Sequence, residues 1–481
     1  MAVPLTAAIL HLTSRAVPPM KLCVIGVGYV GLTTGAGLAS LGHNVLCVDA
    51  DRGKIALLQR GQVPIFEHRL PELIAAARSG GRLAFSHDVA AALQASEVIF
   101  ICVGTPPDAD GKADLAAVEA ATRQVAAQAR GYRLVVSKST VPVRTGEQIQ
   151  RVLATYGREL DFDVASNPEF LREGSGVYDF FHPDRIVVGV SSQRAAARLR
   201  ALYAPVLEGS FHCGWHDQPA EACGWKAPAW VETSINSAEL IKHASNSFLA
   251  MKISYANAIA DICERAGADA GEVLRGMGLD RRIGGEFLRP GLGFGGFCFP
   301  KDLRAFIAMA EELGYDFRLL KEVEAINARR VELLVHKLRQ ELWVLAGKRV
   351  GVLGLAFKAA TDDVRLSPAL AVVRELVRQG VQVRAYDPQA MARARAELGD
   401  TIAYGAAAAD VAEGAEAVLI LTDWPEFRSA DWEAMGARMH RRLVLDGRNL
   451  FAPADLEARG FQYVGMGHAV LLPAMAVPLS A

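Results

Sequence analysis

Short apolar runs rich in β-branched residues alternate with helix-length amphipathic stretches from residue 20 onward. The segments KLCVIGVG (21–28), YVGLTTGAGLASLG (29–42) and HNVLCVDAD (43–51) have the pattern of a strand, a helix and a second strand. Parallel strands are buried on both faces and therefore form continuous apolar runs, so this pattern predicts a βαβ unit. Further strand-like runs in EVIFICVGTP, RLVVSKSTVP, FDVASNP and DRIVVGV extend it into a doubly wound sheet that ends near residue 210.

The pattern changes to helical spacing after about residue 232. The stretch 237–267 keeps apolar residues at helical spacing over most of its length, and 321–342 does the same. A long helix of this kind is a natural dimerisation element. KRVGVLGLAF, ALAVVRELVRQG and VQVRAYDP then repeat the opening motif in weaker form, with Gly354 aligned to Gly26 and Asp387 to Asp49. The repeat predicts a second, smaller Rossmann-like domain.

The predicted fold class is therefore α/β, with two Rossmann-like doubly wound parallel-sheet domains joined by a long central helix. A length of 481 residues agrees with about three units of about 150 residues each. The predicted divisions are a disordered and dispensable extension (1–19), an N-terminal Rossmann domain (20–210), an insertion loop (211–231), a central helical domain (232–342), a C-terminal Rossmann-like domain (347–465) and a tail (466–481).

Charge and composition exclude several classes of function. The chain has 52 basic and 53 acidic residues, so no overall field favours nucleic acid or an anionic membrane surface. No apolar run is long enough to span a bilayer, and a soluble protein is expected. Seven cysteines without regular spacing favour a reducing compartment, the cytoplasm, over a disulfide framework.

The insertion FHCGWHDQPAEACGWKAPAW (211–230) fits no regular element. It holds three tryptophans, two cysteines and two histidines, and His212, Cys213, His216 and Cys223 are candidate metal ligands. Their spacing matches no zinc motif, so the sequence favours a loop packed by its own aromatic side chains and predicts no bound metal.

A dinucleotide-binding motif opens the first domain. Gly26, Gly28 and Gly31 form G-x-G-x-x-G between a strand and a helix, where the helix amino end can hold a pyrophosphate. Asp49 closes the second strand, where a carboxylate accepts from ribose hydroxyls and repels a 2′-phosphate, so NAD is favoured over NADP. Lys54 lies nearby at a helix start, which is also an ordinary place for a surface lysine. The alternative is a glycine-rich turn without a ligand.

A second glycine-rich loop carries a cysteine. Residues 287–302 contain glycines at 291, 293, 295 and 296, followed by Cys298 and, four residues later, Asp302. The glycines let the backbone wrap closely around a ligand. Considered alone, Cys298 could equally be a structural thiol or a nucleophile.

Two further polar clusters favour the nucleophile. Lys242 and Asn246 are four residues apart on the predicted helix, so both lie on one face and can act on one oxygen atom. Glu169 and Glu173 follow the strand FDVAS at the carboxyl edge of the sheet, where such folds bind ligands. The alternatives are a solvated lysine and an exposed helix face with charges at i and i+4.

Seven motifs in one order resemble the UDP-glucose/GDP-mannose dehydrogenase family over residues 20–450: GVGYVGL, VGTPPDADGKADL, KSTVPVRTG, SNPEFLREG, SAELIKHASNSFLAMKIS, FGGFCFPKD and GLAFKAATDDVRLSP. The resemblance implies oxidation of the primary alcohol of a nucleotide sugar to a carboxylate, with UDP-glucose as the favoured substrate and two NAD per turnover. Glucuronate for polysaccharide biosynthesis is the expected use of the product.

The resemblance also assigns the catalytic roles. Cys298 adds to the intermediate aldehyde as a thiohemiacetal and then forms a thioester that water hydrolyses. Lys242 and Asn246 stabilise the developing oxyanion, and Asp302 positions or deprotonates water. Glu169 and Thr140 are candidate polar assistants.

The implied binding residues form two sets. The cofactor set is Gly26, Gly28, Tyr29, Val30, Gly31, Asp49, Lys54, Thr105, Thr140, Glu173 and Arg365. The nucleotide-sugar set is Glu169, Phe170, Leu171, Lys242, Asn246, Arg282, Phe287, Leu288, Arg289, Gly291, Gly295, Phe357, Lys358 and Arg448. Arg282 is expected to reach the substrate of a partner subunit in a homodimer or higher homo-oligomer.

One residue departs from the family pattern. The family loop reads Gly-Gly-Ser-Cys, whereas Phe297 precedes Cys298 here, and a bulky ring can alter loop packing or access to the thiol. The alternatives are GDP-mannose or UDP-N-acetylmannosamine dehydrogenases, a single-step alcohol dehydrogenase that would not need Cys298, and a non-catalytic relative that binds NAD or nucleotide sugars.

Overall fold

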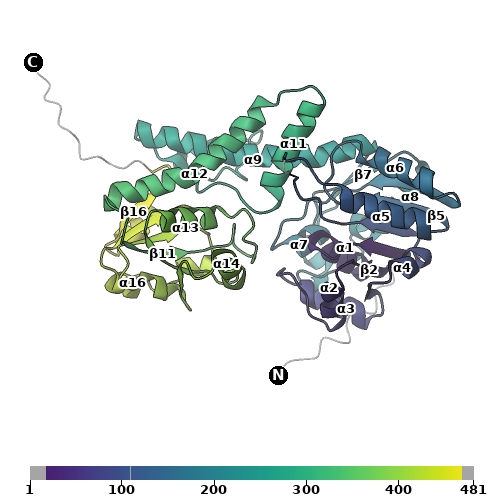
Figure 1. The fold of residues 1–481 in the computed structure, drawn as a ribbon, viewed down its shortest axis with the longest axis horizontal. Helices are drawn as coiled ribbons and strands as arrows, with labels where there is room; N and C mark the ends of the chain where they lie inside the picture. The colour runs from purple at the N-terminus through teal and green to yellow at the C-terminus, as the bar shows by residue number, and fades with distance from the viewer. Residues whose placement is uncertain (1–17, 109, 469–481) are drawn as a thin grey trace, which may run out of the picture. The chain divides into compact units, whose positions relative to one another are not determined.

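The computed structural model describes residues 18–108 and 110–468 (Figure 1). It divides into two compact units between Ala244 and Ser245, and each unit is described by itself. Most of the predicted extension and tail, residues 1–17 and 469–481, lies outside the described residues. Among the described residues, no helix is both long and apolar enough to cross a membrane.

The first unit is built on an eight-stranded sheet in the order β10-β7-β6-β5-β4-β1-β2-β3. All neighbouring strands are parallel except β6 and β7, and the order from β3 to β6 is that of a Rossmann fold. The sheet continues beyond residue 210, because β10 pairs with β7 at its far edge. The strands are β1 (Lys21–Ile25), β2 (Asn44–Val48), β3 (Leu83–Ser86), β4 (Val98–Ile101), β5 (Gly131–Ser137), β6 (Leu160–Ser166), β7 (Arg185–Val190) and β10 (Ala229–Thr233).

Helices cover both faces of this sheet. In β4, Val98 and Phe100 enter one hydrophobic cluster and Ile99 and Ile101 enter the other, which is the alternation expected of a strand buried on both faces. The first cluster is closed by α1 (Tyr29–Ser40), α2 (Arg52–Gln59), α3 (Leu70–Ser79), α7 (Gly176–Phe181) and α8 (Gln193–Glu208). The second is closed by α4 (Val89–Ala95), α5 (Ala116–Gln128) and α6 (Thr145–Tyr156).

The insertion forms a short hairpin with aromatic packing. Strands β8 (His212–Cys213) and β9 (Gln218–Pro219) are antiparallel and are followed by the 3-10 turn η1 (Ala220–Ala222). Phe211 stacks on Phe181 with ring centroids 5.3 Å apart, and Trp225 lies against its edge at 6.4 Å. The insertion is therefore packed by aromatic rings as predicted, but among the ring contacts of the described residues only that between Phe211 and Trp225 is internal, and the insertion packs mainly against α7.

Helices precede the sheet of the second unit. Helix α9 (Ile235–Ala266) begins in the first unit and ends in the second, and is followed by α10 (Ala270–Gly278), α11 (Cys298–Glu312) and α12 (Arg318–Leu342). Six parallel strands then form a sheet in the order β13-β12-β11-β14-β15-β16, which again has Rossmann order. The strands are β11 (Arg349–Leu353), β12 (Gln382–Tyr386), β13 (Ala403–Tyr404), β14 (Ala417–Ile420), β15 (Leu443–Asp446) and β16 (Gln462–Gly465).

Helices α13 (Pro368–Arg378), α14 (Met391–Leu398), α15 (Pro425–Arg428), α16 (Trp432–Arg438) and α17 (Pro453–Glu457), with the 3-10 turn η2 (Ala408–Ala412), complete the second unit. The predicted fold class, with two Rossmann-like domains and a long central helix, is confirmed.

The start of α9 is fastened to α6 by a buried carboxyl. Glu239 accepts hydrogen bonds from the backbone N–H of Arg144 (2.8 Å) and of Gly146 (2.8 Å), and only 2% of it is exposed. Burial raises its pKa from 4.5 to about 7. The folded chain therefore keeps this proton over a pH range in which the unfolded chain releases it.

In Glu239→Gln, the free energy of unfolding is expected to fall less with rising pH than it does in wild type. Because the pKa of Glu239 is raised on folding, its contribution is fully present below about pH 4.5 and is lost as the pH rises to about 7, a change of about 3 kcal/mol. The melting temperature of the variant relative to wild type should therefore increase between pH 5 and pH 8. Parallel melting curves across this range, like those expected for the exposed control Glu119→Gln, would contradict this assignment.

Candidate active site

The glycine turn of the first unit leaves open space at one residue. Gly26 has φ +100°, and a Cβ there would lie 2.7 Å from the carbonyl oxygen of Cys102, so only glycine fits. A Cβ on Gly28, in contrast, would meet nothing within 4 Å. Gly28 caps α1 without a side-chain hydrogen bond. Open space beside the amino end of a helix suits a pyrophosphate.

The two Rossmann-like halves share one backbone brace. Asp49 Oδ2 accepts from the N–H of Val27 at 2.8 Å, and Asp387 Oδ2 accepts from the N–H of Leu355 at 2.7 Å. Gly354 has φ +96°, close to that of Gly26. The predicted alignment of Gly26 with Gly354 and of Asp49 with Asp387 is confirmed.

Of these two aspartates, only Asp49 in the first Rossmann-like half is accessible to a ligand. Asp387 is 1% exposed, and its Oδ2 also accepts from the indole Nε1 of Trp424 at 3.1 Å. Ala356 occupies the position equivalent to Gly28 and is fully buried. Asp49 is half-buried. The residues present therefore fit a dinucleotide in the first unit and not at the equivalent turn of the second.

The loop 167–176 is held by two side chains near this turn. Glu67 accepts from the N–H of Gly174 (2.7 Å) and of Gly176 (2.9 Å), and Tyr29 donates its hydroxyl to the carbonyl of Arg172 (2.6 Å). Burial raises the pKa of Glu67, and burial together with the nearby Glu67 raises that of Tyr29 well above its usual range. Tyr29 was predicted, but Glu67 was missed because the acids in PIFEHRLPEL form no known motif.

A buried ion pair lies at the carboxyl end of the same sheet. Lys242 Nζ donates to Glu169 Oε1 at 3.0 Å, with both side chains about 5% exposed. The second oxygen, Glu169 Oε2, accepts from the N–H of Leu171 at 2.6 Å. The ring of Phe170 lies 5.4 Å from Nζ. Low solvent access makes an ammonium here an effective partner for negative charge on a bound ligand.

Lys138 belongs to this cluster, and Thr105 follows β4, the strand beside β5. Lys138, directly after β5, donates to Asn167 Oδ1 at 3.1 Å, and burial lowers its pKa to about 8. It was missed, although its segment KSTVPVRTG was recognised as a motif. Thr105, which was predicted, donates to the carbonyl of Thr140 at 2.8 Å.

The predicted nucleophile opens a helix in the second unit. Cys298 is the first residue of α11 and is half-buried, and the amino end of a helix favours a thiolate. One turn later, Asp302 Oδ2 accepts from Asn246 Nδ2 at 2.6 Å and Oδ1 accepts from Lys301 Nζ at 2.7 Å. Asp302 and Lys301 are 2% and 5% exposed. Lys301 was missed because lysine beside an acid is common on surfaces.

Glycines allow the loop before Cys298 to pack closely. A Cβ on Gly295 would lie 2.5 Å from the carbonyl oxygen of Leu366, and one on Gly296, which has φ +78°, would lie 2.8 Å from the Phe357 ring. Asn327 holds Phe294 through both its N–H (2.8 Å) and its carbonyl (3.0 Å). The loop conformation is therefore set within the second unit.

Arg448 braces this loop in the structure. Its guanidinium donates to the backbone carbonyls of Leu421 (2.8 Å), Gly293 (2.9 Å) and Phe357 (2.9 Å), and burial lowers its pKa. Three of its five N–H groups are thus used for loop structure. The sequence predicted a substrate contact and did not predict this brace.

Phe297, the residue that departs from the family pattern, packs against two cationic side chains. Its ring lies 4.5 Å from the guanidinium carbon of Arg365 and 5.6 Å from Lys301 Nζ. Arg365 also forms a two-pronged ion pair with Asp363, with its shortest contact at 2.6 Å. The ring therefore fills a defined position beside Cys298, which remains half-buried.

Several predicted binding residues lie at the surface. Arg282 pairs with Asp280 at 2.6 Å and its side chain is 89% exposed, and Arg289 is also exposed. Lys54 lies 4.0 Å from Asp51, which caps α2. Lys358, in contrast, is half-buried, and its Nζ lies 5.7 Å from the Phe357 ring.

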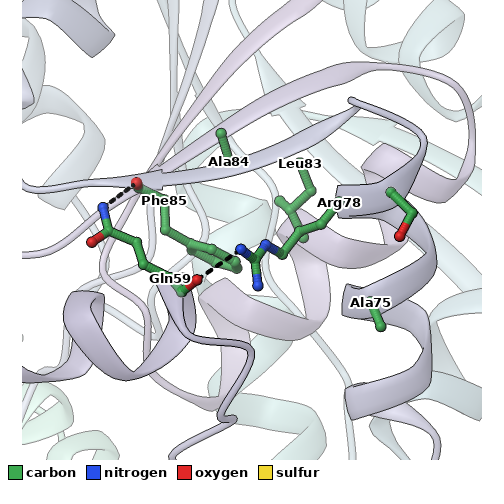
Figure 2. A pocket seen from close by; sticks show the side chains of 7 residues that line it. Gln59, Ala75, Arg78, Leu83, Ala84 and Phe85 are labelled. Carbon is green, nitrogen blue, oxygen red and sulfur yellow. Dashed lines mark hydrogen bonds between the residues drawn. The ribbon is translucent and has the colours of Figure 1, made fainter.

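A separate hollow of about 600 Å³ lies between α2, α3 and β3 (Figure 2). Arg78 projects into it but donates to the carbonyls of Leu58 (3.0 Å) and Gln59 (2.8 Å). Gln59 in turn donates to the carbonyl of Phe85 at 3.0 Å. No predicted site residue lines this hollow, and its polar groups join α2, α3 and β3.

Three family models match the chain in succession. They describe the NAD binding domain (residues 20–207), the central domain (236–329) and the UDP binding domain (351–453) of the UDP-glucose/GDP-mannose dehydrogenase family. The chain belongs to this family. It is an NAD-dependent dehydrogenase, as its accessible Asp49 and open turn at Gly28 indicated.

Relatives of this dehydrogenase match it over nearly its whole length. It is 43% identical to a UDP-glucose 6-dehydrogenase of Pseudomonas aeruginosa, with 93% of this chain and 97% of that protein covered. It is 42% identical to one of Bacillus subtilis, with 93% of each chain covered. Among solved structures, a UDP-glucose dehydrogenase of Pyrobaculum islandicum matches with a TM-score of 0.86 and 40% identity, covering 95% of this chain and all of that one.

Asp49→Asn is expected to weaken NAD binding in this dehydrogenase. A charge-assisted bond to ribose contributes about 1.5–3 kcal/mol, so the KM for NAD should rise about tenfold or more, and use of NADP should improve relative to NAD. Initial rates with each cofactor measure this. Asp387→Asn is the matched control, since it removes the same backbone brace from the second half. Equal KM values for NAD in both variants would contradict the assignment.

Proposed function

We propose that this dehydrogenase oxidises UDP-glucose to UDP-glucuronate in two successive steps. The observation that carries this proposal is Cys298 at the amino end of α11, one turn from the buried pair of Asp302 and Lys301. A dehydrogenase that stops at the aldehyde has no use for such a thiol. The substrate follows the relatives, two of which are UDP-glucose 6-dehydrogenases at 42% and 43% identity.

The proposed reaction combines two hydride transfers to NAD with covalent capture of the aldehyde by the Cys298 thiol. NAD, when bound, accepts one hydride in each of the two oxidations. After the first oxidation, the Cys298 sulfur adds to the aldehyde carbon, and the resulting thiohemiacetal oxygen carries developing negative charge. The second oxidation leaves a thioester, and water then cleaves the carbon–sulfur bond to give the carboxylate and restore the thiol.

Charged side chains assist these steps. Lys242 is held in position by Glu169 and supplies an ammonium for the alkoxide and the thiohemiacetal oxygen, an effect of about 3 kcal/mol per well-placed donor. Asp302, fixed by Asn246 and Lys301, orients or deprotonates the hydrolytic water.

The deciding experiment measures NADH formed per sugar consumed. Wild-type enzyme receives UDP-glucose, UDP-N-acetylmannosamine or GDP-mannose in turn. Two NADH per UDP-glucose, with little turnover of the other two sugars, is expected. Preferred turnover of UDP-N-acetylmannosamine would instead follow the Pyrococcus horikoshii UDP-D-ManNAc dehydrogenase, whose structure matches with a TM-score of 0.79 at 30% identity. One NADH per sugar would exclude the thioester route.

We also propose that this dehydrogenase forms a homodimer through α9. Phe248, Tyr255 and Ile262 lie seven residues apart on α9 and are 57%, 50% and 60% exposed, so they form one apolar stripe on that helix. Stripes at this spacing pack against a second helix. Exposed Arg282 is proposed to reach the partner's substrate. Seven free cysteines support a reducing location, the cytoplasm.

Phe248→Glu with Tyr255→Glu is expected to convert the dimer to monomer, because two carboxylates cannot be buried at a helix pairing without large desolvation cost. Sedimentation velocity measures the change. Leu313→Glu, at an exposed residue outside α9, is the control. A double variant that sediments like wild type would exclude α9 as the interface.

A further inference from the structure

Four side chains of metal-ligand type converge in the first unit, and none of them is assigned to catalysis. His182, Cys213, His216 and Cys223 each offer one ligand atom, and these four atoms all lie within 4.8 Å of one another. His182 caps the end of α7, whereas the other three belong to the insertion. Nothing in the proposed dehydrogenase reaction uses any of them.

Three of the six distances between these atoms are close to the edge of a tetrahedron around a metal ion. Bonds of about 2.3 Å to sulfur and about 2.0 Å to nitrogen place sulfur and nitrogen about 3.6 Å apart around a tetrahedral Zn²⁺. His182 Nε2 lies 3.2 Å from Cys213 Sγ and 3.6 Å from Cys223 Sγ. His216 Nδ1 lies 3.5 Å from Cys213 Sγ. The ligand atoms are therefore already arranged to surround one ion.

The backbone of the insertion is built to present these ligands. Cys-Gly-Trp occurs twice, at 213–215 and 223–225. A Cβ on Gly214 would lie 2.7 Å from a terminal methyl group of Leu73 and 2.9 Å from the Phe181 ring, so glycine suits the close packing of the first turn, and Gly224 has φ +74°. The N–H of Asp217 closes the first turn onto the carbonyl of Cys213 at 2.8 Å. A hairpin with two-residue strands has little stability of its own, so it needs such an anchor.

Aromatic side chains orient the two ligand histidines. The His182 ring stacks on Tyr178 at 4.5 Å, and the His216 ring meets the edge of Tyr178 at 5.8 Å. Cys213 is fully buried and Cys223 is half-buried. His212, in contrast, turns to Asp217 at 3.0 Å and does not belong to the group. The spacing within the insertion resembled no zinc motif because the fourth ligand, His182, lies outside it.

We propose that His182, Cys213, His216 and Cys223 bind one structural Zn²⁺ ion. Four protein ligands leave no open position for water or substrate, so the ion stabilises structure and takes no part in the oxidation. The sequence alone had favoured no metal.

The ion would fasten the segment that carries Glu169. Helix α7 is capped at its carboxyl end by His182, and its first residue, Gly176, is the last residue of the loop 167–176. Within α7, Asp179 binds the Arg172 N–H (2.7 Å) and guanidinium (2.6 Å) of that loop. Joining His182 to the insertion therefore fixes one end of a helix whose other end supports the ligand-binding loop.

Metal content and cobalt spectra of the full-length protein test the proposal. Protein prepared without chelators should contain about one zinc per chain, and Co²⁺ in its place should give intense visible bands and a thiolate charge-transfer band typical of tetrahedral S2N2 sites. Cys213→Ser, Cys223→Ser and His182→Ala should each lose the metal. His212→Ala, the matched control, should keep it.

Three outcomes would overturn the proposal. The first is wild-type protein with reduced thiols that binds neither Zn²⁺ nor Co²⁺. The second is a Cys213–Cys223 disulfide in protein without metal, which would make the cysteines a redox pair. The third is loss of metal in His212→Ala as complete as in His182→Ala. The cobalt spectrum of wild type decides the question even if a ligand variant does not fold.

Discussion

Replacing Cys298 with serine is expected to lower the formation of UDP-glucuronate by about three orders of magnitude or more. A serine hydroxyl is far less ionised than a thiol at neutral pH, and its ester would not repeat the chemistry of a thioester. The amino end of α11 and the partners of Asp302 would be unchanged. The loss would therefore report on the sulfur atom itself.

The measurement for Cys298→Ser is NADH and acid product per UDP-glucose, with an amine reagent present to trap any aldehyde. Cys263→Ser, at a buried cysteine in α9, is the control and should retain two NADH per sugar. Undiminished formation of acid by Cys298→Ser would exclude covalent catalysis by this residue.

Lys242→Met is expected to lower kcat/KM by two to three orders of magnitude, about 3–4 kcal/mol of transition-state stabilisation. Methionine keeps the length of the side chain but removes the ammonium. It also leaves Glu169 buried without its cation, and breaking such a pair costs about 3–5 kcal/mol of stability. The variant should therefore be both slower and less stable.

A second substitution separates the two effects of Lys242→Met. Adding Glu169→Gln removes the uncompensated charge, so the double variant should recover part of the melting temperature but not the activity. Recovery of both would indicate that the ammonium serves only to hold Glu169. A wild-type kcat in Lys242→Met would show that the Lys242 ammonium takes no part in the chemical step.

Periodicity and short motifs predicted much of the fold. The βαβ pattern of residues 21–51, the repeat at Gly354 and the helical spacing of α9 are local signals, and the structure agrees with all three. Strand β10 was missed because it joins the sheet after an irregular insertion, and no local pattern specifies the strand with which it pairs.

The residues missed in the candidate site share one property. Glu67, Lys138 and Lys301 act through partners distant in sequence or through burial, neither of which a motif records. Arg448 was noticed for its charge, but its donors are directed to backbone carbonyls that only the folded loop brings near. His182 joins Cys213 for the same reason.

The brace formed by Asp49 has a consequence for the entropy of cofactor binding. Its two oxygens hold the N–H groups of Val27 and Asp51, both at 2.8 Å, so the glycine turn is ordered by the protein's own contacts. Ordering a flexible loop on binding would subtract from affinity, whereas a turn that is already rigid avoids this cost. One carboxylate thus preorganises the backbone donors, and on the proposed role of Asp49 it would also accept from the ribose, so the dinucleotide would associate without a folding step in this turn.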